Sequence, residues 1–154
     1  MGMTYVEKIE KARKKGIEIP DNILEENFVG LYKFFRTKDN EEAYCFYIGK
    51  STNIAHRLLD SSRGHIYMYL NNNLTYIVPK EIDKYLQEGY RVKVEIIEIN
   101  YYDKEFTYAA HRLALAELSE IVKYQEQGQC KLQVPEGVGK YEEEFWNGKY
   151  KIQS

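Results

Sequence analysis

The sequence predicts an α+β fold, in which a small central antiparallel sheet of three strands is flanked by helices in the order β-β-α-α-β-α. Residues 28–36 and 43–48 have the composition of two hairpin strands around a charged tip. Residues 91–99 contain a third strand, because apolar and charged side chains alternate from Val92 to Ile96. Residues 104–126 show the apolar spacing of a long helix.

The helices are predicted from spacing and from their end signals. Residues 3–15 form a charged amphipathic helix that ends at Gly16, and Pro20 begins a short helix that runs through Asn27. N-cap residue types at 50–53 precede a helix over 54–60. Further helical stretches run from His65 to about residue 70 and from Pro79 to about residue 88.

Three regions follow from this order. Residues 1–27 are predicted to be a helical N-terminal extension, and 28–126 the main domain. Residues 127–154 show no clear period and are predicted to be an irregular C-terminal extension packed on or near the domain.

Composition limits the classes of function. A net charge of −2 argues against a protein that coats DNA non-specifically, although it permits a local basic groove. The 15 tyrosines suit either a polar binding surface or a strand-rich core with half-buried rings. Cys45 and Cys130 lack metal-ligand spacing and are expected to be ordinary reduced cysteines. Without an apolar span or a signal-peptide pattern, we expect a cytoplasmic protein with no membrane partner.

Two tyrosines are predicted to face each other across the hairpin. If Asp39 and Asn40 form a two-residue turn, antiparallel pairing places Tyr32 directly opposite Tyr47, and both phenols point to the same face. A glycine next to each tyrosine would let another chain or a ligand approach the backbone.

An acidic residue interrupts the apolar face of the long helix. Glu117 falls among Leu113, Ile121 and other apolar residues of that face, which are Phe106, Ala110 and Tyr124. A carboxylate there is costly unless it is paired or bound to a cation. Two explanations remain open, a structural ion pair to a buried Arg or Lys and a ligand for Mg²⁺ or Mn²⁺. Glu120, on the flank of the face, is the weaker candidate.

The hairpin and the next helix together carry a recognisable pattern. Gly30-Leu31-Tyr32, Tyr47-Ile48-Gly49-Lys50, Asn53-Ile54 and Arg57-Leu58 resemble the motif of the GIY-YIG nuclease superfamily in order and in spacing. Glu117, followed four residues later by Ile121, is similar to the metal-binding position of that family. The resemblance covers residues 28–126.

The resemblance implies hydrolysis of a DNA phosphodiester with one divalent ion, Mg²⁺ or Mn²⁺. It implies that Tyr32 positions or deprotonates the attacking water and that Tyr47 hydrogen-bonds the water or the phosphate. Arg57 would stabilise charge on the phosphate oxygens, and Glu117 would hold the metal. The remaining candidates for substrate binding or proton transfer are Lys50, Asn53, His56 and His65.

One departure from the family pattern keeps alternatives open. Many members have an Asn soon after the metal-binding helix, whereas residues 129–140 contain Pro135 and no Asn. The expected partner is DNA, branched and single-stranded forms included, with a partner protein that could supply DNA specificity. The alternatives are a non-catalytic nucleic-acid-binding or interaction module that keeps the fold, and a nuclease that acts on RNA.

Overall fold

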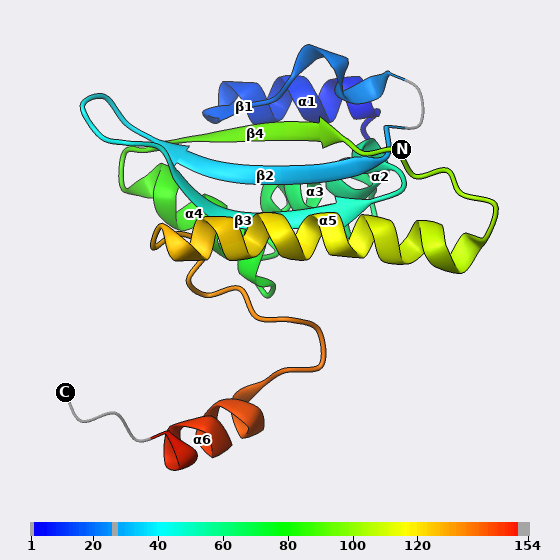
Figure 1. Cartoon of the computed structure of the whole chain (residues 1–154). Helices are drawn as coiled ribbons and strands as arrows, with labels where there is room; N and C mark the ends of the chain where they lie inside the picture. The colour runs from blue at the N-terminus through cyan, green and yellow to red at the C-terminus, as the bar shows by residue number, and fades with distance from the viewer. Residues whose placement is uncertain (1, 26–27, 151–154) are drawn as a thin grey trace.

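A four-stranded mixed sheet lies at the centre of the protein, whose computed structural model describes residues 2–25 and 28–150 (Figure 1). The strands are β1 (Ile17–Glu18), β2 (Gly30–Thr37), β3 (Tyr44–Ser51) and β4 (Arg91–Glu98), in the order β1-β4-β2-β3. The α+β prediction is confirmed, but the three-stranded antiparallel sheet is wrong. Strand β1, which pairs in parallel with β4, was not predicted, because a strand of two residues is too short to show an alternating pattern.

The helices lie close to the positions that the sequence predicts. They are α1 (Tyr5–Lys14), α2 (Ile54–Leu59), α3 (His65–Leu70), α4 (Ile77–Gln87), α5 (Phe106–Glu126) and α6 (Lys140–Lys149). The turn after Pro20 is a short 3-10 helix, η1 (Asp21–Leu24), and the predicted end of that segment at Asn27 lies outside the described residues. Thr4 begins α1 with a capping box, in which its hydroxyl accepts from the Glu7 N–H.

The helices form two layers around the sheet. Helices α1 to α4 cover one face, where side chains of β2 and β4 such as Phe34, Val92 and Val94 enter a continuous apolar core. The N-terminal segment belongs to this core through Ile9 and Ile17. Helix α5 crosses the other face, mainly over β3.

The contact between α5 and the sheet combines apolar packing with one ion pair. Ile121 and Tyr124 of α5 pack on a small cluster of buried residues that includes Phe35 and Ile48. Lys33 of β2 is buried and forms an ion pair with Glu120. Phe106, which the sequence places on the packed face of the helix, is instead exposed at its first turn.

The register of the hairpin differs from the predicted one. Tyr32 pairs with Gly49, and Phe34 pairs with Tyr47, because the loop after β2 is longer than two residues and a bulge follows Phe34. Each irregularity shifts the pairing by one residue. Since side chains alternate with period two, two shifts return Tyr32 and Tyr47 to the same face. The two phenols are therefore diagonal neighbours rather than directly opposed residues.

Two glycines make room for groups of the protein itself. A Cβ on Gly49 would lie 2.2 Å from Cζ of Tyr32, so the tyrosine ring lies directly against this glycine. A Cβ on Gly30 would lie 1.9 Å from the carbonyl oxygen of Ile97 in β4. The expected approach of a ligand or another chain to these glycines is thus replaced by close packing within the sheet.

The C-terminal extension is less irregular than the sequence predicts, and it completes the edge of the sheet. The backbone N–H of Cys130 donates to the carbonyl of Cys45 at 2.9 Å. The Gln133 side-chain amide bonds both the N–H and the carbonyl of Ile48. These contacts occupy the open edge of β3, which would otherwise expose unpaired backbone groups.

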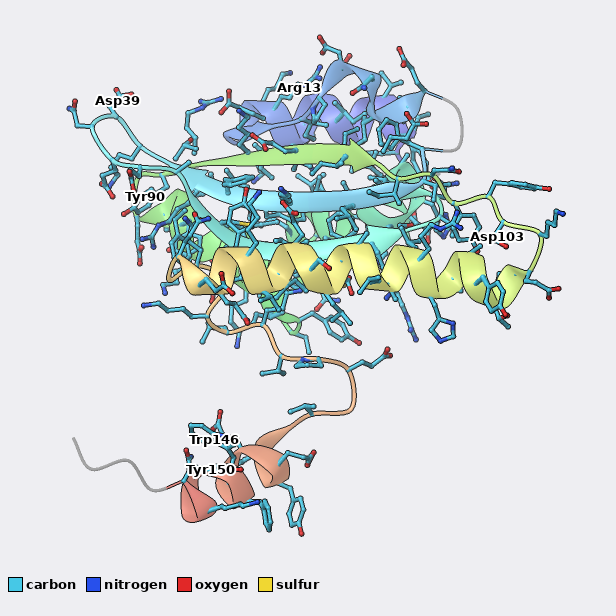
Figure 2. All side chains as sticks on the ribbon, in the orientation of Figure 1. Arg13, Asp39, Tyr90, Asp103, Trp146 and Tyr150 are labelled. Carbon is cyan, nitrogen blue, oxygen red and sulfur yellow. The ribbon has the colours of Figure 1, made fainter. Side chains whose placement is uncertain are left out.

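Helix α6 was not expected, and it has no buried residue. Figure 1 shows it apart from the sheet, and Figure 2 shows Trp146 and Tyr150 on it beyond the main body. Within the described residues, no helix has both the length and the apolar character needed to cross a bilayer.

We predict that Gly49→Ala destabilises the fold, because the added methyl group would overlap the Tyr32 ring. Overpacking of this kind typically costs about 1–3 kcal/mol. Urea unfolding followed by circular dichroism measures the loss. Gly148→Ala is the matched control, since no atom lies within 4 Å of its added Cβ. An unfolding free energy of Gly49→Ala equal to that of the wild type would contradict the packing described above.

Candidate functional site

A pocket of about 740 Å³ lies beside the edge strand β3 and gathers the residues that the motif singles out. Tyr32, Tyr47, Arg57 and Glu117 all line it, although they come from β2, β3, α2 and α5. The structure thus brings these four predicted residues together in one pocket. Lys50 lines the same pocket.

The edge strand explains how elements from both layers reach one site. Successive residues of a strand point to opposite faces, so Tyr47 faces the α1–α4 layer, whereas Ile48 and Lys50 face α5. Asn53 begins α2 directly after β3, because its side chain accepts from the N–H of His56. One turn of α2 then brings Arg57 back to the strand. The pocket thus extends around the edge of β3 from one layer to the other.

Both tyrosines are shielded from water, and this shielding determines their charge state. Tyr32 is 1% exposed, and its ring lies 6.3 Å from that of Tyr47. Burial raises the pKa of both phenols above the usual value, and the negative charge of Glu117 raises them further, while Arg57 opposes the shift. Both side chains are therefore neutral phenols at neutral pH.

His65 holds the hydroxyl of Tyr32. Their Oη and Nε2 atoms are 2.9 Å apart, and His65 is buried at the start of α3. Burial, together with the nearby positive charge of Arg57, lowers the pKa of His65 to about 3, so its imidazole is neutral. Its Nδ1 atom is also buried and has no partner among the described residues. Of the two histidines that the sequence analysis proposed, His65 is the one in contact with the site.

Arg57 supplies positive charge to the pocket. Its guanidinium is half-buried and donates one hydrogen bond, at 2.9 Å, to the carbonyl of Arg63. Among residues 2–25 and 28–150, no carboxylate forms an ion pair with it. A guanidinium without an acidic partner can bind an anion with its remaining donors.

Glu117 faces the pocket from α5, and its side chain is 18% exposed. Lys50 Nζ lies 3.6 Å from its Oε1 atom, which is a loose ion pair. Burial raises the pKa of Glu117, Lys50 opposes the shift, and the charge of Glu136 adds to it. A tight ion pair with a buried lysine was one of the two explanations for Glu117. The structure shows such a pair for Glu120, which binds Lys33, whereas Glu117 has only the loose pair with Lys50.

The other two proposed residues lie outside this pocket. Asn53 uses its side chain as the cap of α2 and is exposed. His56 is also exposed, and its ring contacts Tyr5 and Asp60.

The C-terminal extension contributes residues that sequence reasoning missed. Gln133 and Glu136 of this extension line the pocket together with the motif residues, and so does Gln125 of α5. Gln125 of α5 donates to the carbonyls of Cys130 and Gln133 and so holds the extension beside the site. Pro135 was the only signal in this stretch, and it does not reveal where the chain runs.

The described residues contain no cluster of three or more His, Cys, Asp or Glu side chains that could hold a metal. Glu117 and Glu136 nevertheless bring two carboxylates to one open pocket. Mg²⁺ is commonly held by one or two protein carboxylates and several waters, so this donor set fits Mg²⁺ or Mn²⁺.

No family model, curated protein or solved structure matches the chain.

We predict that His65 makes stability depend on pH between 7 and 5. Its pKa is lowered from 6.5 to about 3 in the folded state, so the unfolded chain binds a proton first as the pH falls. Stability from the neutral imidazole is therefore complete above pH 6.5 and decreases below it. From pH 7 to pH 5 the loss is about 2 kcal/mol.

Urea unfolding of the wild type and His65→Gln at several pH values measures this contribution. The free-energy difference between the two proteins should shrink by about 2 kcal/mol from pH 7 to pH 5. His111→Gln, at an exposed position, should leave the pH dependence unchanged. Parallel curves for the wild type and His65→Gln would show that His65 is not held neutral.

Proposed function

We propose that the protein is a divalent-metal-dependent endonuclease that hydrolyses DNA phosphodiester bonds through a GIY-YIG-type site. The observation that carries this proposal is the meeting of two phenols, an inward carboxylate and a guanidinium in one pocket, the guanidinium having no acidic partner among residues 2–25 and 28–150. If these four side chains served only to pack the core, they would not need to line one open pocket from four separate elements.

Arg57 binds the scissile phosphate in this proposal. Its planar donors match phosphate oxygens, and no carboxylate among the described residues competes for them. Lys50, at the mouth of the pocket, adds a second positive charge that is only loosely paired with Glu117. Both cations stabilise negative charge that develops on the phosphate oxygens during attack by water.

Tyr32 and Tyr47 position the attacking water. As neutral phenols they donate hydrogen bonds, and a buried phenol of raised pKa is a weak base by itself. Tyr32 Oη lies 2.9 Å from Nε2 of neutral His65, which fixes the orientation of the phenol. His65 donates this hydrogen bond when its proton is on Nε2 and accepts it when its proton is on Nδ1.

Glu117, with Glu136 beside it, would hold the metal ion. When bound, Mg²⁺ or Mn²⁺ supplies charge stabilisation for the phosphate and the leaving oxygen. Burial raises the pKa of Glu117 and the charge of Glu136 adds to this effect, so the positive charge of the ion would offset the repulsion between the two carboxylates.

The alternative is a nucleic-acid-binding module without catalysis. The near-complete burial of Tyr32 favours this alternative, because a phenol that is 1% exposed has little access to bulk water. Arg57 and Lys50 would still bind phosphate in such a protein, so loss of binding in their variants does not separate the two functions. Cleavage does.

We predict that the purified protein nicks supercoiled plasmid in the presence of Mg²⁺ or Mn²⁺. Removal of the phosphate-binding guanidinium in Arg57→Ala, or of the metal ligand in Glu117→Gln, should reduce the rate by about 100-fold or more. Conversion of supercoiled to open-circular plasmid on agarose gels measures the rate, and EDTA should abolish it.

Matched controls come from exposed residues outside the pocket. Glu126→Gln changes a carboxylate on the same helix as Glu117, and Arg91→Ala removes an arginine of β4. Both should nick like the wild type. Equal nicking by all variants would disprove the assigned site. DNA binding that requires Arg57, without any cleavage by the wild type, would favour the non-catalytic module. RNA and branched DNA substrates in the same assay define the substrate class.

A further inference from the structure

The only two cysteines of the chain lie side by side although 85 positions separate them. The sulfur atoms of Cys45 and Cys130 are 3.5 Å apart, both are free thiols, and both residues are fully buried. Cys45 belongs to β3, and Cys130 to the segment that covers the edge of this strand. The spacing in sequence gave no indication of this pair.

The backbone around Cys130 holds its side chain towards Cys45. Its N–H donates to the Cys45 carbonyl at 2.9 Å, and the N–H of Cys45 donates in turn to the Gln129 side chain at 2.6 Å. Cys130 also adopts a left-handed backbone with φ of 52°, which is unusual for a residue other than glycine. The chain therefore turns at Cys130 with its sulfur directed at β3.

The same segment forms a wall of the candidate site. Three residues beyond Cys130, Gln133 bonds the backbone of Ile48, and Glu136 then lines the pocket that contains Glu117. Only six positions in the chain therefore separate Cys130 from Glu136 in the pocket.

We propose that Cys45 and Cys130 are a thiol pair that a small-molecule disulfide oxidises reversibly, and that the resulting disulfide fixes the segment 129–136 to β3. A thiolate of the pair attacks the disulfide of oxidised glutathione, which releases one glutathione thiolate and leaves a mixed disulfide on the protein. The second cysteine then attacks this mixed disulfide and releases the second glutathione. The protein loses two protons and two electrons, and the glutathione disulfide gains them as two thiols.

The surroundings of the pair support this chemistry. The hydrogen bond with Cys45 lowers the pKa of Cys130 against the effect of burial, and the positive charge of Lys33 acts in the same direction. The pKa of Cys45 is raised, first by its hydrogen bond with Cys130 and then by burial. The pair therefore shares one proton once the first has left, and Cys130 provides the thiolate that attacks.

Access to the buried sulfurs requires the extension to leave β3 briefly. The bonds that anchor this segment are one backbone hydrogen bond from Cys130 and side-chain bonds of Gln125, Gln129 and Gln133. Such a contact opens at lower cost than a strand pair inside the sheet. The oxidant therefore reaches the two sulfurs only when the segment 129–136 is away from β3, and the disulfide forms only when the segment has returned.

The first test is the intact mass of the native protein after incubation with oxidised glutathione at pH 8. The wild type should lose the mass of two hydrogen atoms, regain it with dithiothreitol, and lose both titratable thiols without forming a dimer. Cys45→Ser keeps the attacking Cys130 and should instead gain the mass of one glutathione, whereas Cys130→Ser keeps only Cys45, whose pKa is raised, and should gain it more slowly. A wild type that stops at the mixed disulfide, forms disulfide-linked dimers or keeps both thiols would overturn the proposal.

The second test follows the segment itself and does not depend on nuclease activity. Hydrogen exchange of the amides in 129–136 should slow by about tenfold or more in the oxidised wild type, because the covalent link restricts opening. The Cys130→Ser protein, treated in the same way, should show no slowing. Unchanged exchange in a fully oxidised wild type would show that the disulfide does not fix the segment to β3.

Discussion

The contact between the Tyr32 ring and Gly49 is the constraint on which the rest of the site depends. A Cβ at position 49 would overlap the ring, so only glycine permits β2 and β3 to pair while the Tyr32 side chain stays fully buried in the core on the α1–α4 face. This contact holds the Tyr32 hydroxyl on His65 and the ring beside Tyr47. The same contact is consequently needed both for packing of the sheet and for the placement of Tyr32 in the pocket.

The sequence predicted the hairpin better than it predicted the register, and the reason is physical. Periodicity identifies which face a side chain occupies, but it does not count residues in a loop or detect a bulge. The predicted two-residue turn at Asp39 and Asn40 was too short, and the bulge after Phe34 was not foreseen. The shared face of Tyr32 and Tyr47 survived because the two shifts together preserve parity. Strand β1 was missed for a related reason, since a two-residue strand shows no period.

Helix α5 shows which part of a site can be predicted from one element and which cannot. An acidic residue within an apolar stripe is visible in the sequence, and the structure indeed turns Glu117 into the pocket. The partner of each carboxylate is set by the sheet, however, so spacing alone could not assign the buried lysine to Glu120. The path of the C-terminal extension was beyond prediction altogether. It depends on side-chain amides of Gln125 and Gln133 that take the place of a neighbouring strand, and such contacts leave no periodic signal.

Burial is the largest influence on the charge state of the acidic groups in the pocket. Burial raises the pKa of both tyrosines and of Glu117, which means that the protein stabilises their neutral forms more than water would. Arg57 works in the opposite direction on the phenols, and Lys50 does so on Glu117. An added phosphate or cation would therefore change the electrostatic balance at several of these groups together. The segment that carries Glu136 is attached through Cys130 to the same strand as Tyr47, so a movement of that segment would change the contribution of Glu136 to the field at Glu117. The segment that covers the edge of β3 therefore also contributes a charged residue to the site.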